Sequence, residues 1–235
     1  MASAPAATPA HALSPIRIRP ALPQDAERHP ELLGPLPPQL AWALGEGGLS
    51  TSLEAATEGR QKFHEALAAA HARGYNTALS SVSAALVAVT ADDEPLGSLI
   101  VTPAVRAFRQ PDTFTGHSQL ERLSLIFAAE ILTMTVPESS RTGAALLHSA
   151  ADLYSRAGYG ILFGAVRADV EAPLPAPFST VGAGKALCLD PAFLGHAVGL
   201  ALVRPEPNTR IYYSSLQEEP QTGWEYELTG NEPVP

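Results

Sequence analysis

The sequence has little of what disulfide-rich, membrane-spanning and nucleic-acid-binding proteins need. Cys188 is the only cysteine, which excludes an internal disulfide framework and a metal site built from cysteines. No apolar run approaches the length of a membrane span, and residues 1–14 lack the basic start and apolar centre of a secretory signal. Basic residues are also scarce, since 15 lysines and arginines against 24 acidic residues give a formal net charge of −9. That charge argues against nucleic acid as a partner.

The remaining composition is that of a globular protein. Hydrophobic residues make up 46% of the 235 positions, enough for one large domain with its own core. We expect a disordered leader over residues 1–14, a single domain over 15–216 and a loose tail over 217–235. The simplest location for such a chain is the cytoplasm. Its acidity would suit a cationic substrate such as an amine.

The chain is organised around residues 128–166. Residues 128–136 are apolar and β-branched, as in a buried strand, and Pro137 ends them. Residues 138–143 form a short polar turn, and an amphipathic helix is predicted from about Ala144 to a stop at Gly158. Residues 161–166 read as the next strand. The predicted unit is therefore strand, tight turn, helix, strand.

The turn has a chemical consequence. The first turn of a helix carries unpaired N–H groups and the positive end of the helix dipole. Arg141 adds a cation there, which the dipole disfavours unless a phosphate binds between them. Small residues that let a ligand approach the backbone follow it, namely Thr142, Gly143, Ala144 and Ala145. The alternative is an ordinary strand–helix turn with an exposed arginine.

Several motifs resemble one family. The run VPESSRTGAALL, after an apolar strand and before A-x-x-x-Y-x-x-x-G-Y, resembles the acyl-CoA-binding motif of the GNAT superfamily of N-acetyltransferases. IRPALPQDA near the start resembles the opening of that family, and VAVTADDEPLG resembles its hairpin. The turn is shorter than the family's and keeps a single glycine, Gly143. Residues 178–187 also lack the tyrosine that the family carries on a helix there, where it protonates the departing thiolate.

The other elements fit the same order. We predict a strand at 16–19, a helix from Ala26 capped by Asp25, a helix over 54–73, and a hairpin of strands 84–90 and 96–102. Residues 120–127 either begin the central strand or form a separate element. The last strands are predicted at 196–203 and 209–216. The fold class is α/β with a mixed sheet; the resemblance implies a GNAT-like twisted sheet, flanked by helices, with a V-shaped splay between its central strands.

The resemblance implies transfer of an acyl group from acetyl-CoA to an amine of unknown identity, on a small molecule or a peptide, with no metal. A homodimer is compatible with the sequence. By the same resemblance the loop amides hold the CoA pyrophosphate, at Arg141, Thr142, Gly143, Ala144 and Ala145. The backbone at the splayed end of the central strand would hold the thioester carbonyl, around Met134, Thr135 and Val136.

Catalytic groups are harder to assign. Glu130 is the candidate base because a carboxylate inside an apolar strand is costly to bury and is therefore expected to have a function. The alternative is that Glu130 forms a salt bridge or lies at an exposed strand end. Tyr212 and Tyr213 are candidate acids. Two rival functions remain open. One is a non-catalytic acyl-CoA-binding or degenerate domain that acts through a partner, and the other is an unrelated α/β scaffold that binds an anion.

Overall fold

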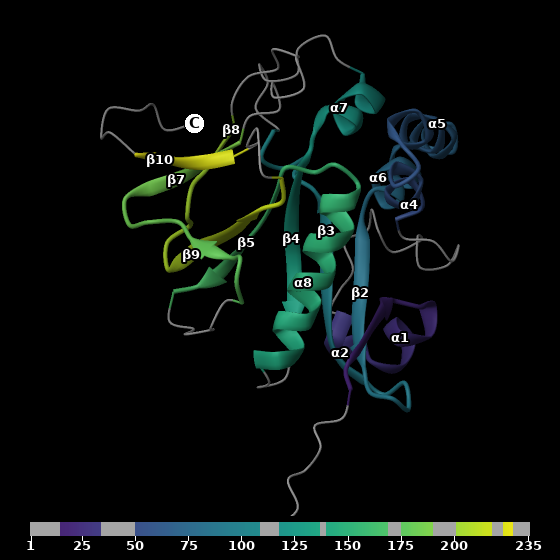
Figure 1. The fold of residues 1–235 in the computed structure, drawn as a ribbon, viewed down its shortest axis with the longest axis horizontal. Helices are drawn as coiled ribbons and strands as arrows, with labels where there is room; N and C mark the ends of the chain where they lie inside the picture. The colour runs from purple at the N-terminus through teal and green to yellow at the C-terminus, as the bar shows by residue number, and fades with distance from the viewer. Residues whose placement is uncertain are drawn as a thin grey trace, which may run out of the picture.

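The structure is a computed structural model that describes residues 15–33, 50–108, 118–136, 140–168, 175–189, 201–217 and 223–227. Its centre is a seven-stranded mixed sheet with the order β1–β2–β3–β4–β5–β9–β6 (Figure 1). These strands are β1 (Arg17–Pro20), β2 (Ala84–Val89), β3 (Pro95–Pro103), β4 (Ala128–Thr135), β5 (Ile161–Arg167), β6 (Ser179–Thr180) and β9 (Thr209–Ser215). A second, three-stranded sheet has the order β10–β7–β8, with β7 (Lys185–Leu189), β8 (Ala201–Val203) and β10 (Gly223–Glu227).

Helices flank the large sheet. They are α1 (Pro23–Arg28), α2 (Pro30–Leu33), α4 (Thr51–Ala56), α5 (Arg60–His71), α6 (Tyr75–Ser81), α7 (Gln119–Leu125) and α8 (Ser140–Arg156). In the part of the chain that the structure describes, no helix is long and apolar enough to cross a membrane. The mixed sheet with flanking helices is the fold class predicted from the sequence.

The central strands diverge. Among the described strands, β4 and β5 form the parallel pair, which needs a crossover that α8 supplies. Their pairing runs only from Ala128 opposite Ile161 to Ile131 opposite Gly164. Beyond that point β4 stays paired with β3 as far as Thr135, and β5 stays paired with β9 through its last residue. The V-shaped splay that the resemblance implied is therefore present, and it opens after Ile131 and Gly164.

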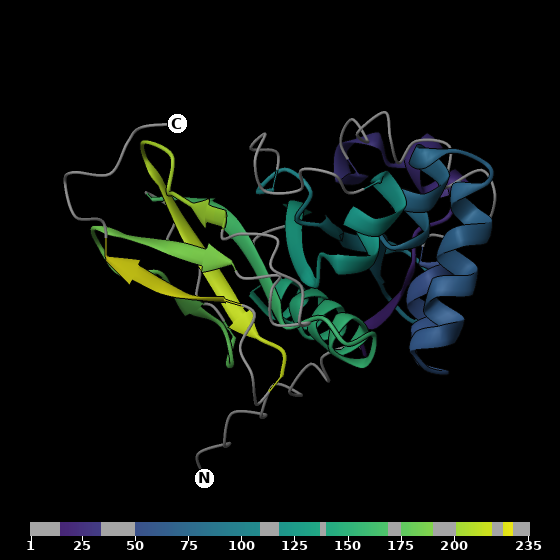
Figure 2. The same cartoon turned by 90° about the horizontal axis from the view of Figure 1, so that it is seen from above.

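The two faces of the sheet are covered differently (Figure 2). On one face α8 packs Leu147, Ala150 and Tyr154 into a core that includes Leu99 and Ala129. The buried Tyr154 hydroxyl donates to the carbonyl oxygens at positions 82 and 101, 3.1 and 3.2 Å away, so its burial leaves no polar atom unsatisfied. The other face meets α1 and α2 at one end and, at the other end, the second sheet.

The sequence predicted some boundaries wrongly. The helix expected over 54–73 is broken into α4 and α5, because Gly59 adopts φ 119° between them. Residues 120–127, left open above, contain helix α7, whose Ser118 cap accepts a hydrogen bond from the Glu121 amide. Asp25 lies inside α1 rather than at its cap, where its carboxylate accepts from the Leu22 amide at 2.7 Å.

Three further differences concern the site and the tail. Helix α8 begins at Ser140, not near Ala144, so Arg141 lies in its first turn rather than in a preceding loop. The tail predicted to be loose contains β10, which pairs with β7. The strand predicted at 196–203 is described only as β8, since its earlier residues, like residues 1–14 and 137–139, lie outside the described ranges.

Candidate functional site

The first turn of α8 packs directly against the end of β4. A Cβ atom added to Gly97 on β3 would lie 2.9 Å from the Thr135 carbonyl oxygen, 3.1 Å from Val136 Cγ1 and 3.2 Å from Thr142 Cγ2. Only a glycine allows this approach without a shift of the backbone. Thr142 is buried here, whereas Arg141 is exposed. Gly97 therefore allows the N-terminus of α8 to pack against the open end of β4.

The structure brings the two predicted groups of cofactor-binding residues together. A Cβ atom on Gly143 would lie 3.8 Å from Val136 Cγ2, which is ordinary contact distance. Met134 and Thr135 pair with β3 on one edge, and beyond Ile131 the other edge of β4 has no β5 partner. Because successive amides of a strand point to opposite edges, alternate amides of this segment face the splay. Backbone donors and the start of a helix thus meet at one opening.

A β-bulge lies at the same point. Val101 pairs with Ile131 and Ile100 with Thr133, so Leu132 falls between the two pairs as an extra residue. Bulges bend a strand and increase its local twist. This bulge coincides with the end of the β4–β5 pairing and accounts for the direction in which β4 leaves its neighbour.

Tyr212 covers the apex of the splay on the α8 face. It is the cross-strand partner of Gly164, and a Cβ atom on that glycine would lie 2.7 Å from the Tyr212 hydroxyl oxygen and 3.0 Å from Ile131 Cβ. Its side chain belongs to the core that α8 covers. Burial raises the pKa of Tyr212 to about 12. The phenol is therefore protonated at neutral pH, as a proton donor must be.

Tyr213 points to the opposite face and has other partners. Its hydroxyl donates to Glu225 Oε1 at 3.3 Å, and Lys185 Nζ lies 3.1 Å from Glu225 Oε2. Burial, and then the neighbouring Glu225 carboxylate, raise the pKa of Tyr213. This group ties β9 to the second sheet. The structure thus separates the two tyrosines that the sequence offered as acids.

Glu130 lies on the same face as Tyr213, at the edge of a cavity of about 600 Å³. It is opposite Phe163 in the β4–β5 register, and Phe163 packs in the core shared with the second sheet. Arg106 forms an ion pair with Glu130, with Nη2 2.6 Å from Oε1 and Nε 3.3 Å from Oε2. The salt bridge that the sequence allowed as an alternative is what the structure contains. The candidate base is nevertheless placed in a cavity at the splay.

Sequence reasoning missed Arg106, Gly97 and Gly164. Arg106 looked like the beginning of a polar loop, yet a turn after β3, in which the Ala104 amide donates to the Ala128 carbonyl at 2.8 Å, brings it beside Glu130. A glycine within an apolar strand signals close approach by a neighbour, which both glycines make here. No group of three or more potential metal ligands occurs within the described ranges.

Comparisons with known proteins give structural matches alone. No protein-family model matches the sequence, and no curated protein does. An acetyltransferase of the GNAT family from Staphylococcus aureus Mu50 is 12% identical with a TM-score of 0.41, over 86% of this chain and 100% of its own. The aminoglycoside 6'-N-acetyltransferase from Enterococcus faecium is 12% identical with a TM-score of 0.39, over 87% and 99%.

A Salmonella typhimurium protein solved with its cofactor acetyl-CoA is 13% identical with a TM-score of 0.41, over 88% of this chain and 97% of its own. These identities concern the fold, and the case for a function rests on the geometry of the chain itself.

Proposed function

We propose that this protein is an acyl-CoA-dependent N-acyltransferase that transfers an acetyl group from acetyl-CoA to an amine. The observation that carries the proposal is the divergence of the parallel strands β4 and β5 beside the first turn of α8. Such a splay exposes backbone donors that the sheet would otherwise use, and the helix start beside it is suited to a phosphate. Acetyl-CoA carries a thioester at one end and a pyrophosphate further along its chain, so its binding needs both features.

The donor binds along the α8 face. Because α8 begins at Ser140, the amides of Gly143, Ala144 and Ala145 already donate within the helix, and the amides available to the pyrophosphate are those of Ser140, Arg141 and Thr142. The exposed side chain of Arg141 pairs with the pyrophosphate from the same turn. The small side chains of Gly143, Ala144 and Ala145 follow this turn and leave room for the phosphates beside it. A bound phosphate also removes the penalty of placing Arg141 at the positive end of the helix dipole.

The thioester then lies at the open edge of β4. An amide among Met134, Thr135 and Val136 donates to the carbonyl oxygen, where negative charge develops as the amine attacks. The amine nitrogen forms a bond to the carbonyl carbon, and the carbon–sulfur bond breaks. The amine loses its proton, directly or through water, to Glu130 at the cavity on the other face.

Tyr212 supplies the proton that the departing thiolate takes up. It lies at the apex of the splay and is protonated, because burial raises its pKa to about 12. The family's tyrosine belongs to a helix that this chain lacks in residues 175–189, which form β6 and β7 instead. A tyrosine of β9 takes its place in this proposal. Tyr213 is excluded from that role because its hydroxyl is bonded to Glu225 on the far face.

Two measurements test the proposal together. Purified protein is titrated with CoA by calorimetry and is assayed with acetyl-CoA against a panel of amines, with free thiol as the readout. We expect CoA binding, and thiol release that depends on at least one amine class. Absence of CoA binding at millimolar ligand contradicts the proposal. CoA binding without thiol release across the whole panel favours the rival function, a non-catalytic acyl-CoA-binding domain.

A further inference from the structure

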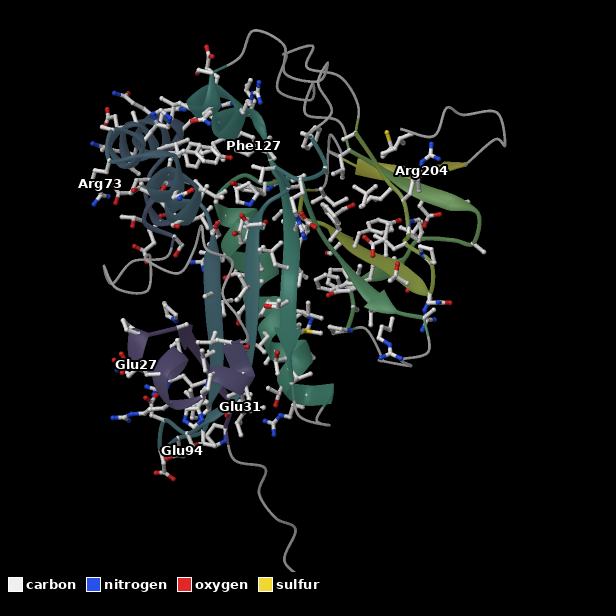
Figure 3. All side chains as sticks on the ribbon, turned by 180° about the vertical axis from the view of Figure 1, so that it is seen from behind. Glu27, Glu31, Arg73, Glu94, Phe127 and Arg204 are labelled. Carbon is white, nitrogen blue, oxygen red and sulfur yellow. The ribbon has the colours of Figure 1, made fainter. Side chains whose placement is uncertain are left out.

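The cavity on the far face of the splay carries balanced charge. The charged groups among the described residues that line it are two guanidinium groups, of Arg106 and Arg204, and two carboxylates, of Glu130 and Glu206. Arg204 directly follows β8, and Figure 3 shows it beside the second sheet. A polycationic acceptor needs an excess of carboxylates, which this lining does not offer. The lining instead suits a small molecule that carries both signs of charge, and its volume of about 600 Å³ is large enough for one.

Glu130 holds the guanidinium group of Arg106 in one orientation and uses only some of its N–H donors. Two of its nitrogens, Nε and Nη2, face the two oxygens of Glu130. Its third nitrogen, Nη1, makes no hydrogen bond to the residues that the structure describes. The Arg106 side chain is 53% exposed, whereas that of Glu130 is 16% exposed. The carboxylate on the sheet thus orients a guanidinium group that still has three of its five N–H donors for an anion, two on Nη1 and one on Nη2.

We propose that Arg106, oriented by Glu130, binds a carboxylate of the acceptor, so that the acceptor is an amine that also carries a carboxylate, in the class of the amino acids. This inference rests on the proposed acyl transfer, because it assigns the second substrate of that reaction. The amine would point through the splay toward the thioester while the carboxylate stays in the cavity. Arg106 is accordingly a specificity-determining residue and takes no part in bond making.

The anion at Arg106 has a second potential source, the phosphates of CoA. The geometry favours the acceptor, because Glu130 and Arg106 lie on the face that packs against the second sheet, and the first turn of α8 lies on the other. CoA affinity therefore separates the two sources. An Arg106 that served the donor would lose CoA binding when substituted, and an Arg106 that serves the acceptor would not.

The test uses acceptors in matched pairs that differ only by a carboxylate. L-Phenylalanine is compared with phenethylamine, and L-lysine with cadaverine, by thiol release from acetyl-CoA. We expect kcat/KM to favour the carboxylate-bearing member roughly 10- to 100-fold. Arg106→Gln should bring that ratio close to one, mainly through KM, while Arg106→Lys retains part of it. Arg28→Gln, at an exposed arginine of α1, is the control that should leave the ratio unchanged.

Binding supplies a second readout that does not need turnover. Each amine is titrated by calorimetry into CoA-loaded wild type and Arg106→Gln, and CoA is titrated into both. The inference is supported if wild type prefers the amine that carries the carboxylate, if this preference disappears in Arg106→Gln, and if CoA affinity is unchanged. The same binding result without any turnover would support the inference and contradict only the proposed acyl transfer. Three results would overturn the inference: equal affinity of wild type for both amines of a pair, a preference that survives in Arg106→Gln, or loss of CoA affinity in that variant.

Discussion

The two faces of the sheet at the splay have opposite chemistry. The α8 face offers backbone amides, a helix start and Tyr212, a protonated phenol in an apolar core. The cavity face offers the ion pair of Arg106 and Glu130 and, among mainly apolar lining residues, a second arginine and a second glutamate. The consecutive residues Tyr212 and Tyr213 show the contrast directly, because one closes the apex of the splay and the other bonds to Glu225. The difference suggests that donor and acceptor approach from opposite faces and meet where β4 and β5 part.

Removing the phenol hydroxyl on the α8 face should have the largest effect. Tyr212→Phe deletes the proposed proton donor and should lower kcat roughly 10²- to 10⁴-fold. CoA affinity should change little, since the pyrophosphate contacts lie at α8. Because the pKa of Tyr212 is about 12, its ionisation should not limit kcat at neutral or mildly alkaline pH. Steady-state kinetics with a pH profile measures this, and Tyr213→Phe is the matched control.

A wild-type rate in Tyr212→Phe would mean that water or another group protonates the thiolate. Tyr212 and Tyr213 would then differ in their positions and partners but not in a catalytic role. A larger loss in Tyr213→Phe than in Tyr212→Phe would place the acid on the cavity face instead.

Filling the apex of the splay should be the next largest effect. In Gly164→Ala the new Cβ would lie 2.7 Å from the Tyr212 hydroxyl oxygen and 3.0 Å from Ile131 Cβ, so the ring must move. We expect a loss of about 1–3 kcal/mol in the free energy of unfolding, with reduced kcat. Gly143→Ala is the control, because its Cβ finds contacts at 3.8 Å and beyond. Denaturant unfolding compares the two; equal stability would show that Tyr212 is free to move aside.

Substituting the carboxylate on the cavity face should have a smaller effect that distinguishes two roles. If Glu130 is the base, Glu130→Gln lowers kcat roughly tenfold or more and removes the acidic limb of the pH–rate profile. If Glu130 only orients Arg106, KM for the acceptor rises and the pH profile keeps its shape. Neither role predicts weaker CoA binding. A variant that lost CoA affinity would contradict the separation of the two faces.

Local signals explain why the unit β4–α8–β5 could be predicted. The apolar strand, the small residues and the amphipathic helix are contiguous, so each signal reports on its neighbours in sequence. The helix start was nevertheless misplaced, because Thr142 and Gly143 look like turn residues although the first helical turn tolerates both. The positions of Met134–Val136 and Arg141–Ala145 beside one another follow from the same short connection.

Contacts between distant segments could not be predicted in this way. Arg106 and Glu130 are 24 residues apart and meet because β3 and β4 are paired in a particular register. The position of Tyr212 over Gly164 depends on the β5–β9 register in the same way. Strand β10 was missed because it forms by pairing with β7, a contact that no local sequence pattern indicates.

The central claim is that the donor binds on the α8 face alone, and one calorimetric comparison tests it most directly. CoA is titrated into wild type, Arg141→Glu and Arg106→Gln, with circular dichroism as the control for folding. Arg141→Glu replaces attraction by repulsion at the pyrophosphate and should weaken CoA binding by roughly 2–4 kcal/mol, whereas Arg106→Gln should bind as wild type does. Wild type that fails to bind at millimolar CoA, or an Arg141→Glu variant that binds as tightly as wild type, would contradict the claim.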